Sequence, residues 1–341
     1  MRKVMIGFVV LLVVGAILYF RFRSSRAPIG VAYAGNRDVT LWSSTAQVRE
    51  AVAMLKYGDR LEILQRSQDE VQVRTAKKVI GWTEESNLLS ADVWEKARDL
   101  EARAAVSPVE ARGHTHAISN LRVDAGRDSP RIQQLSKAVP LELYARAVVN
   151  APAPAAPAQS TAANAPPAPE AAPPEVKKED WWLVRARLPD QATVSGWILS
   201  RFVDLDVPAP LPDYASSAGM RIVAWFELAR VADTPGTTRP QFLVVGSRGP
   251  EGQPCDFTLM RVYTWGKQRE RYETAYVESN LCGTLPVKVT QAATPRSDVT
   301  FSFQDSSGGS AETRAYVMHQ TVVKRVREPG SSPSRRKNAH G

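Results

Sequence analysis

The stretch YGDRLEIL at residues 57–64 returns as KAVPLELY at residues 137–144, eighty positions later. Each copy makes a turn and then enters a run in which apolar and polar side chains alternate, which is typical of a half-buried β-strand. At the offset of 80, the matched pairs are Leu41 with Leu121, Leu55 with Leu135, Leu61 with Leu141, Glu62 with Glu142, and Ile63 with Leu143. This spacing indicates that one small structural unit occurs twice.

A second pair of matching segments follows each copy at a larger offset. Residues 71–89 (VQVRTAKKVIGWTEESNLL) correspond to residues 182–203, so that Gly81-Trp82 aligns with Gly196-Trp197. Each unit contains about five short alternating runs and no helical pattern. We therefore expect two small β-barrels, because closing so small a sheet removes its unpaired edges.

The larger offset comes from an insertion in the second unit. Residues 151–174 consist of 24 residues, of which 19 are Ala or Pro. A segment without bulky apolar side chains cannot offset its ordering entropy by burial, so we expect a disordered insert over residues 147–178. A spacer is favoured over a proline-rich ligand segment, because the tract lacks arginine and aromatic residues.

These motifs resemble the bacterial SH3-like (SH3b) family. The second unit carries the family pattern in NLRVDAGRDSPRIQQLSKAVPLELY, WWLVRA and GWILSRFV, through Leu121, Arg122, Gly126, Trp182, Val184, Gly196 and Trp197. It departs from the pattern at Ala138, where the first unit keeps the turn glycine as Gly58. The resemblance implies SH3-like barrels at residues 30–90 and 113–207, which would bind peptidoglycan or an extended peptide of a partner.

Tryptophan and arginine side chains supply the candidate ligand contacts. Trp82 and Trp197 follow the turn glycine, where the family's tryptophan is largely structural. Adjacent residues of a strand face opposite sides, so one of Trp181 and Trp182 is expected near the surface. Trp42 replaces the arginine-like position of the motif and is also expected to be exposed. The predicted ligand-binding residues are Trp42, Trp181, Trp182 and Arg122.

Positive charge is concentrated at the two ends of the chain. Residues 1–26 and residues 324–341 carry +5 each, which leaves −1 for everything between them. A nucleic-acid-binding domain would be basic in its folded part, so no nucleic-acid partner is expected. The basic C-terminal end is predicted to be a disordered tail over residues 327–341.

The N-terminal end predicts a membrane anchor over residues 1–26. Val4–Phe20 is a run of 17 uncharged, mostly apolar residues, close to the shortest length that spans a bilayer as a helix. The small-residue pattern Ala32-Tyr33-Ala34 lies too far downstream for a signal cleavage site, which favours an uncleaved signal anchor. We expect a single-pass protein of the bacterial inner membrane, with its body in the periplasm or cell exterior.

Two further regions complete the predicted organisation. Residues 91–112 form a linker with a helix at 90–105, for which Asp92 and Glu95 suggest a capping box. Residues 212–326 contain seven runs that read as strands, with no family resemblance, and predict an antiparallel β-sandwich-like domain, with a strongly bent antiparallel sheet as the alternative. The chain is therefore expected to be mainly β, with two SH3-like barrels, this C-terminal domain and one transmembrane helix.

The two cysteines, Cys255 and Cys282, suit one disulfide in an oxidising compartment. Two unrelated reduced thiols remain the alternative. A nucleophilic Cys255 with His319 as its base would be the basis of a cell-wall cysteine hydrolase, but the sequence around Cys255 has no helix start to activate a thiol.

No other chemistry is indicated by the sequence. The histidines are His114, His116, His319 and His340. His114 and His116 lie in a loop-like stretch without the nearby cysteines that would complete a four-ligand zinc site, so no metal and no cofactor are predicted. No phosphate loop or nucleophile elbow is present. The sequence favours a non-enzymatic, membrane-anchored envelope binding protein. The alternative is a structural scaffold that presents the C-terminal domain, and a cysteine hydrolase is less favoured.

Overall fold

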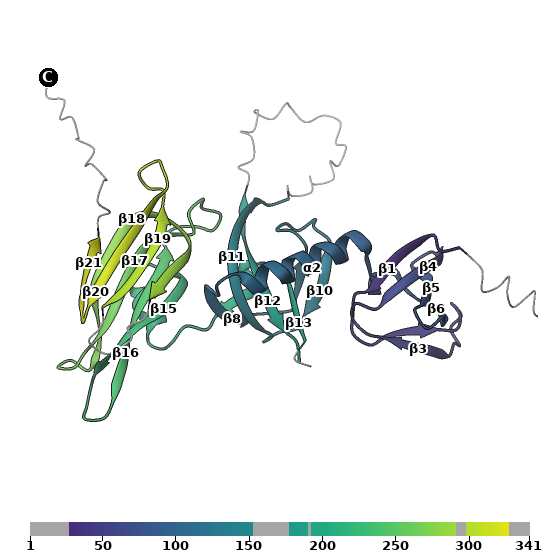
Figure 1. Ribbon diagram of the computed structural model, residues 1–341, viewed down its shortest axis with the longest axis horizontal. Helices are drawn as coiled ribbons and strands as arrows, with labels where there is room; N and C mark the ends of the chain where they lie inside the picture. The colour runs from purple at the N-terminus through teal and green to yellow at the C-terminus, as the bar shows by residue number, and fades with distance from the viewer. Residues whose placement is uncertain (1–26, 153–176, 190–191, 291–297, 327–341) are drawn as a thin grey trace, which may run out of the picture. The chain divides into compact units, whose positions relative to one another are not determined.

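A computed structural model describes residues 27–152, 177–189, 192–290 and 298–326. The chain is mainly β, with three antiparallel sheets of seven strands each (Figure 1). It divides into two compact units after Asp99, and each unit is described by itself. Within the described residues no helix has the length and apolarity needed to cross a membrane. The predicted anchor at residues 1–26 and the predicted tail at residues 327–341 lie outside those residues.

The first sheet belongs to the first unit and has the strand order β3-β2-β6-β5-β4-β1-β7. Its alternating apolar side chains form one core, which includes Leu41, Leu61, Ile63, Val71 and Val73. Its strands are β1 (Gly30–Ala34), β2 (Val39–Trp42), β3 (Ala51–Leu55), β4 (Arg60–Ser67), β5 (Glu70–Thr75), β6 (Ile80–Glu84) and β7 (Leu88–Ser90), with a 3-10 turn η1 (Glu85–Asn87).

The second sheet has the equivalent order β10-β9-β13-β12-β11-β8-β14, so the sequence repeat corresponds to a repeated topology. Its strands are β8 (Ala111–Thr115), β9 (Ser119–Arg122), β10 (Arg131–Leu135), β11 (Pro140–Asn150), β12 (Lys178–Arg187), β13 (Thr193–Leu199) and β14 (Val203–Leu205), with a 3-10 turn η2 (Ser200–Phe202). The insert separates β11 from β12. Residues 147–150 and 178, expected to be disordered, belong to strands because Asn150 pairs with Lys178.

The expectation of closed barrels is wrong, because neither sheet closes on itself within the described residues. In the first sheet β3 pairs only with β2 and β7 pairs only with β1, so both remain edges. A register shift between Leu41 and Trp42 disturbs the pairing of β3 with β2. Bulges of this kind protect an edge without closing the sheet.

The expected linker helix is present as α2 (Ala91–Val106). Its N-terminus is capped by Ser90, whose Oγ accepts a hydrogen bond from the Val93 amide at 3.3 Å, rather than by the predicted Asp92–Glu95 box. In the first unit, Trp94 stacks on Tyr33 with 4.9 Å between ring centroids. The helix buries Ala97, Leu100 and Ala104 along one face, as its spacing predicts.

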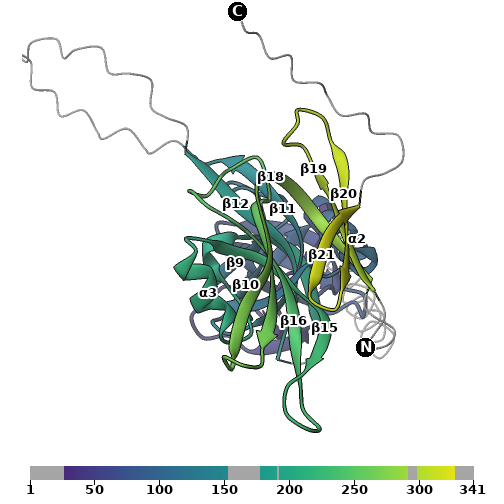
Figure 2. The same ribbon diagram turned by 90° about the vertical axis from the view of Figure 1, so that its left-hand side faces the viewer.

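The C-terminal sheet is a meander in which the strands follow one another in sequence order, shown in green to yellow in Figures 1 and 2. It is one continuous sheet and not the two separate sheets of a sandwich. Its strands are β15 (Arg221–Ala232), β16 (Thr238–Ser247), β17 (Phe257–Gly266), β18 (Arg271–Thr290), β19 (Val299–Asp305), β20 (Glu312–His319) and β21 (Val322–Val326), preceded by α3 (Leu211–Ser217).

The strand boundaries differ from the expected ones at β18 and at Gln320. Residues 272–279 and 285–289 read as separate strands, but Asn280 takes a left-handed conformation (φ 60°) without ending the strand. The first part of β18 pairs with β17 as far as Gly283, and the part beyond Gly283 pairs with β19. One long strand thus joins two halves of the sheet. Conversely, residues 313–326 divide into β20 and β21 at Gln320 (φ 53°), a turn with no Gly or Pro to mark it.

Candidate binding face of the first sheet

Two tryptophans lie opposite each other on neighbouring strands of the first sheet. Trp42 of β2 pairs with Trp82 of β6, and Trp82 in turn pairs with Gln72 of β5. Paired residues of an antiparallel sheet share a face, and the neighbouring Leu41 and Val71 point into the core. Trp42 and Trp82 therefore lie on the outer face, and both are half-buried.

Charged side chains border this pair. The Arg49 guanidinium lies 4.8 Å from the centre of the Trp42 ring and forms an ion pair with Glu70 at 2.6 Å. Guanidinium groups stack on indole rings and hold them in place. We call Trp42, Trp82, Arg49 and Glu70 the tryptophan face. It combines flat aromatic surface with hydrogen-bonding groups, which suits a sugar ring or an extended peptide.

In the second sheet, a different residue with different contacts stands at the position equivalent to Trp42. Arg122 occupies the place of Trp42 and pairs with Trp197, which is 9% exposed. The Arg122 guanidinium donates a hydrogen bond to the carbonyl of Ser129, so it holds the loop between β9 and β10. Burial, together with the nearby Arg131, lowers the pKa of Arg122. A ligand contact by Arg122, as predicted from the sequence, would therefore compete with its hydrogen bond to the Ser129 carbonyl.

The expectation that Trp181 or Trp182 lies near the surface is wrong. Trp181 is 2% exposed and Trp182 is 6% exposed. Trp182 lies on the same face as Val184, which is fully buried, while Trp181 shares its face with Arg185. Arg185 forms an ion pair with Glu101 of α2 at 3.0 Å, so the C-terminal half of this helix covers the outer face of β12.

A further bond fixes this part of α2 on the second sheet. Ser195 of β13 donates a hydrogen bond to Glu101 at 2.5 Å. In the same region of the sheet, burial and a hydrogen bond to Glu142 raise the pKa of the Tyr144 hydroxyl to about 12. The outer face of the second sheet is thus occupied by the chain itself.

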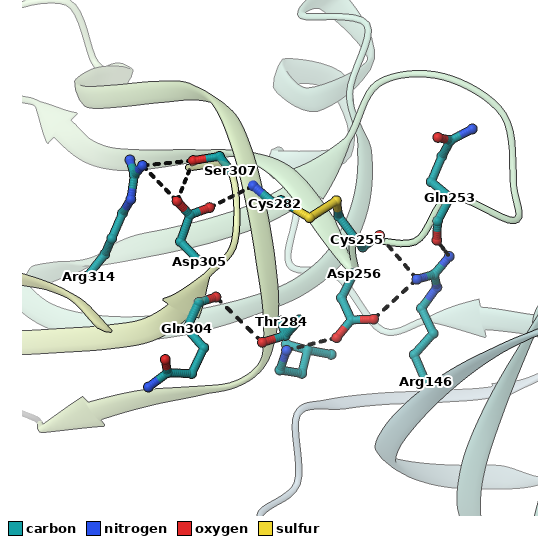
Figure 3. Close-up of a disulfide and its surroundings, with 11 residues drawn as sticks. Arg146, Gln253, Cys255, Asp256, Cys282, Thr284, Gln304, Asp305, Ser307 and Arg314 are labelled. Atoms are coloured by element: carbon teal, nitrogen blue, oxygen red, sulfur yellow. Dashed lines mark hydrogen bonds and ion pairs between the residues drawn. A yellow bond between two sulfur atoms is a disulfide. The ribbon is translucent and has the colours of Figure 1, made fainter. Parts of the chain in front are cut away.

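A buried ionic cluster joins the second sheet to the C-terminal sheet, and we call it the junction. The Arg146 side chain, 4% exposed, forms ion pairs with Asp180 at 2.6 Å and with Asp256 at 3.1 Å. It also donates to the carbonyl oxygens of Gln253 and Cys255. Figure 3 shows Arg146 pointing at this loop. Asp180 belongs to the same sheet as Arg146, so the ion pair with Asp256 is the one that links the two domains.

The disulfide Cys255–Cys282 lies beside the junction, with an S–S distance of 2.03 Å (Figure 3). The described residues hold no free cysteine. A disulfide-bonded sulfur is not a thiolate, so the Cys255 nucleophile of the hydrolase alternative is lost while the bond is intact. His319, its proposed base, instead hydrogen-bonds Asp298 at 2.7 Å.

The remaining histidines do not assemble into a metal site in the part of the chain that the structure describes. His114 and His116 lie on and just after β8, and each hydrogen-bonds one aspartate, Asp206 at 2.9 Å and Asp204 at 3.0 Å respectively. All four side chains are solvent-accessible. His340 lies outside the described residues.

Sequence reasoning proposed Trp42 as a ligand contact, gave Trp82 a structural role, and missed the charged residues beside them. Arg49 and Glu70 belong to segments with no motif, and only the folded sheet brings them to one indole ring. Sequence reasoning also missed Arg146, because its partner Asp256 lies 110 residues away in the chain. One sequence signal for Arg146 existed, since an arginine within the apolar run LELYARAVV calls for a buried partner.

Comparisons with known proteins give no family for this chain. No protein-family description and no curated protein matches the sequence. Among solved structures the chain is similar to NlpC2 from Trichomonas vaginalis, with 7% identity over 89% of this chain and 97% of that chain. The TM-score is 0.18, which is too low to indicate a shared fold, so this similarity carries no argument about activity.

Proposed function

We propose that the chain is a non-catalytic, membrane-anchored protein of the bacterial cell envelope. Its SH3-like repeats recognise peptidoglycan or an extended peptide of a partner, and the tryptophan face of the first sheet makes the contact. The N-terminal segment at residues 1–26 holds the protein in the inner membrane, and the body lies in the periplasm or at the cell exterior. The protein uses no cofactor and has no nucleic-acid partner.

The observation that carries this proposal is the difference between equivalent faces of the two repeats. In the first sheet Trp42 and Trp82 form a half-exposed aromatic pair. In the second sheet Arg122 binds its own loop, and α2 lies over the neighbouring strands. Exposed aromatic side chains with a polar border are common anchors for ligands.

The junction favours a second function for the second repeat. The Arg146 side chain pairs with Asp256, and the Gly252 amide donates to Asp180, so these contacts connect the second repeat to the C-terminal domain and the second repeat supports that domain. If the first repeat acted in the same way, the whole chain would be a scaffold that presents the C-terminal sheet. In that case Trp42 would contribute nothing to binding.

Co-sedimentation of the full chain, in detergent micelles, with purified sacculi tests the proposal. We expect the wild-type chain to sediment with sacculi and Trp42→Ala to bind at least about tenfold more weakly, since an aromatic anchor carries about 1–3 kcal/mol or more. Val322→Ala serves as the matched control, because Val322 is an apolar side chain, 55% exposed, on the C-terminal sheet.

The outcomes separate the hypotheses. Absence of sedimentation by the wild-type chain removes peptidoglycan as the ligand and leaves the extended peptide. Equal binding by wild type and Trp42→Ala, with loss of binding on deletion of residues 212–341, shows that the chain is a scaffold. Release of soluble wall fragments that depends on Cys255 would show that the chain is a hydrolase.

A further inference from the structure

The disulfide Cys255–Cys282 connects a loop of the C-terminal domain to strand β18. Cys255 lies in the loop of residues 248–256, which joins β16 to β17, and Cys282 lies within β18, 27 residues further along the chain. The next residue, Gly283, is the point at which β18 changes its partner from β17 to β19. The bond therefore attaches this loop to the middle of the C-terminal sheet (Figure 3).

The same loop supplies partners for Arg146 of β11. The carbonyl oxygens of Gln253 and Cys255 accept hydrogen bonds from the guanidinium at 2.9 Å and 3.1 Å, and the Asp256 carboxylate forms its ion pair at 3.1 Å. Cys255 thus carries a sulfur of the disulfide and, through its carbonyl, accepts from Arg146. A change in the position of Cys255 therefore changes the contact that links the two domains.

Gly252 of this loop makes a second contact with the second sheet. Its buried amide donates a hydrogen bond to Asp180 of β12 at 2.9 Å. A Cβ at Gly252 would lie 2.5 Å from the Cβ of Lys178, so the loop backbone packs directly on β12. Glu251 also accepts a hydrogen bond from Ser200 of the second repeat at 3.3 Å. The loop therefore contacts the second repeat through several successive residues.

Few bonds hold the loop to its own sheet. Within the described residues, residues 249–254 form no hydrogen bond with the rest of the C-terminal domain. At the end of the loop, the Asp256 amide donates to the Gly283 carbonyl at 2.9 Å, and the Asp256 carboxylate accepts from the Leu285 amide at 2.8 Å. The disulfide at Cys255 is the other attachment, and it is the covalent one.

The disulfide is placed where another molecule can reach it. Cys255 and Cys282 are both half-buried and not enclosed in the core. The chain has no third cysteine, so the bond opens only through a thiol from another molecule. Disulfides open by attack of a thiolate on one sulfur, and partly exposed disulfides are more easily reduced than enclosed ones.

We propose that Cys255–Cys282 is a redox-sensitive link that controls how firmly the C-terminal sheet is held to the second sheet. One thiolate of a dithiol attacks a sulfur of the bond, the S–S bond breaks, and the other cysteine leaves as a thiolate that takes up a proton. The second thiol of the dithiol then attacks the mixed disulfide and frees the remaining cysteine. The protein gains two electrons and two protons, and the dithiol is oxidised to a disulfide.

In the reduced protein the loop keeps its hydrogen bonds at Asp256 and loses its covalent attachment to β18. The loop then moves away from Arg146 and Asp180 more readily, so the contact between the two domains weakens while each sheet keeps its own strand pairing. The reductant is a dithiol of the kind that protein disulfide oxidoreductases carry. This link does not involve the tryptophan face, and it holds or fails whatever that face binds.

Reduction of the folded full chain by dithiothreitol, in detergent micelles, tests this link. Free thiols are trapped with N-ethylmaleimide and counted by mass spectrometry, and hydrogen exchange is followed at the Gly252 amide, whose bond to Asp180 joins the two domains. We expect both cysteines to become reduced without denaturant. The Gly252 amide should then exchange at least about tenfold faster, while amides of the first sheet, which has no cysteine, keep their rates.

The variant Cys255→Ser/Cys282→Ser is the matched control for the reductant. It should show the fast exchange of reduced wild type and no response to dithiothreitol. If this variant does not fold, wild type that has been reduced and alkylated provides the same comparison. In Arg146→Ala the loop has already lost its contact with the guanidinium, so dithiothreitol should speed exchange at Gly252 by less than about threefold.

Two results would overturn the proposal. In the first, dithiothreitol reduces the disulfide only after denaturant has unfolded the chain, which makes the bond purely structural. In the second, both cysteines are reduced in the folded chain and the Gly252 amide still exchanges at its oxidised rate, which makes the junction independent of the bond. Re-oxidation should restore slow exchange, and a permanent loss of protection would equally contradict a reversible link.

Discussion

The first and second sheets share a strand order but differ in what their surfaces contact. Ile29 and Glu110 occupy the same place before the first strand, and the amide of each donates to an equivalent carbonyl, Ile63 or Leu143, at 2.8 Å. Ile29 is 64% exposed, whereas Glu110 is 2% exposed and reaches β18. The same backbone thus carries an exposed apolar side chain in one copy and a buried acid in the other.

Arg66 and Arg146 make the same contrast at the offset of 80. Arg66 is half-exposed and pairs with Glu85 within its own sheet, while Arg146 is buried in the junction. The second copy has become the support for the C-terminal sheet, and its outer face is occupied by α2. The first copy keeps its outer tryptophans available. Four substitutions test this difference between the two copies, in order of decreasing expected effect.

Arg146→Ala should have the largest effect. Removing Arg146 takes away the close partner of the buried Asp180 carboxylate and leaves it only the Arg221 guanidinium, at 3.8 Å, as an ion-pair partner within the described residues. Breaking a buried ion pair in this way costs about 3–5 kcal/mol. Arg66→Ala, at the equivalent exposed position, should cost less than about 1 kcal/mol. Amide hydrogen exchange checks this: protection should fall in β11, β12 and β17 of Arg146→Ala and stay unchanged in the first sheet. Equal effects of the two variants would show that the junction is not a buried support.

Gly58→Ala should destabilise the first sheet by about 2 kcal/mol. Gly58 has φ 83°, a left-handed conformation that costs a residue with a side chain about 1–2 kcal/mol. An added Cβ would also lie 2.7 Å from the Trp94 ring. Amide hydrogen exchange of the first sheet in increasing denaturant measures the loss, and a change below about 0.5 kcal/mol would contradict this account of the turn.

Glu110→Gln should change the pH dependence of stability. Burial, with a smaller contribution from Asp256, raises the pKa of Glu110 to about 7, against the opposing hydrogen bond from Val287. A carboxyl with a raised pKa binds its proton more tightly in the folded state, so wild type loses stability as the pH rises from about 4.5 to about 7.

Relative to wild type, Glu110→Gln should therefore gain on the order of 2 kcal/mol between pH 5 and pH 8. Urea unfolding of the second unit at both pH values measures this difference. Ile29→Gln is the matched change in the first sheet and should show no pH dependence. A pH-independent difference for Glu110→Gln would mean that Glu110 is ionised in the folded protein throughout this range.

Ala138→Gly should stabilise the second sheet by about 1 kcal/mol, the smallest effect of the four. Ala138 has φ 63° at the turn where the first copy has Gly58, so the alanine is strained and a glycine is not. Thermal unfolding should show a rise in Tm of a few degrees. A fall in Tm would show that the alanine side chain makes a stabilising contact that outweighs the strain.

Local patterns predicted the repeat well, because alternation and the Gly-Trp pair depend on residues close in sequence. The alignment of Leu61 with Leu141 corresponds to equivalent core positions in the two sheets. The departure at Ala138 also proved informative, since the residue adopts the conformation that the missing glycine would favour. The helix at 90–105 followed from its periodicity, although its cap was misplaced.

The wrong predictions share one physical cause, because each depends on contacts between segments that are distant in the sequence. Trp181 was expected at the surface because alternation describes a sheet with one open face, and no local pattern reveals that Trp181 is buried on the other face. Glu110 and Arg146 are buried by a domain more than 100 residues later in the chain. Strand pairing also decides whether a sheet closes and where the hairpin at Gln320 turns, and no single segment of sequence encodes which strands pair.

Oxidative footprinting of the tryptophans with and without purified sacculi shows whether the tryptophan face contacts the cell wall. The full chain is labelled, and modification of each tryptophan is measured by mass spectrometry. We predict several-fold protection of Trp42 and Trp82 when sacculi are present, with unchanged modification of Trp265, a half-buried tryptophan of the C-terminal sheet. Unchanged modification of Trp42 and Trp82 on chains that have bound sacculi would contradict the claim that the tryptophan face makes the contact.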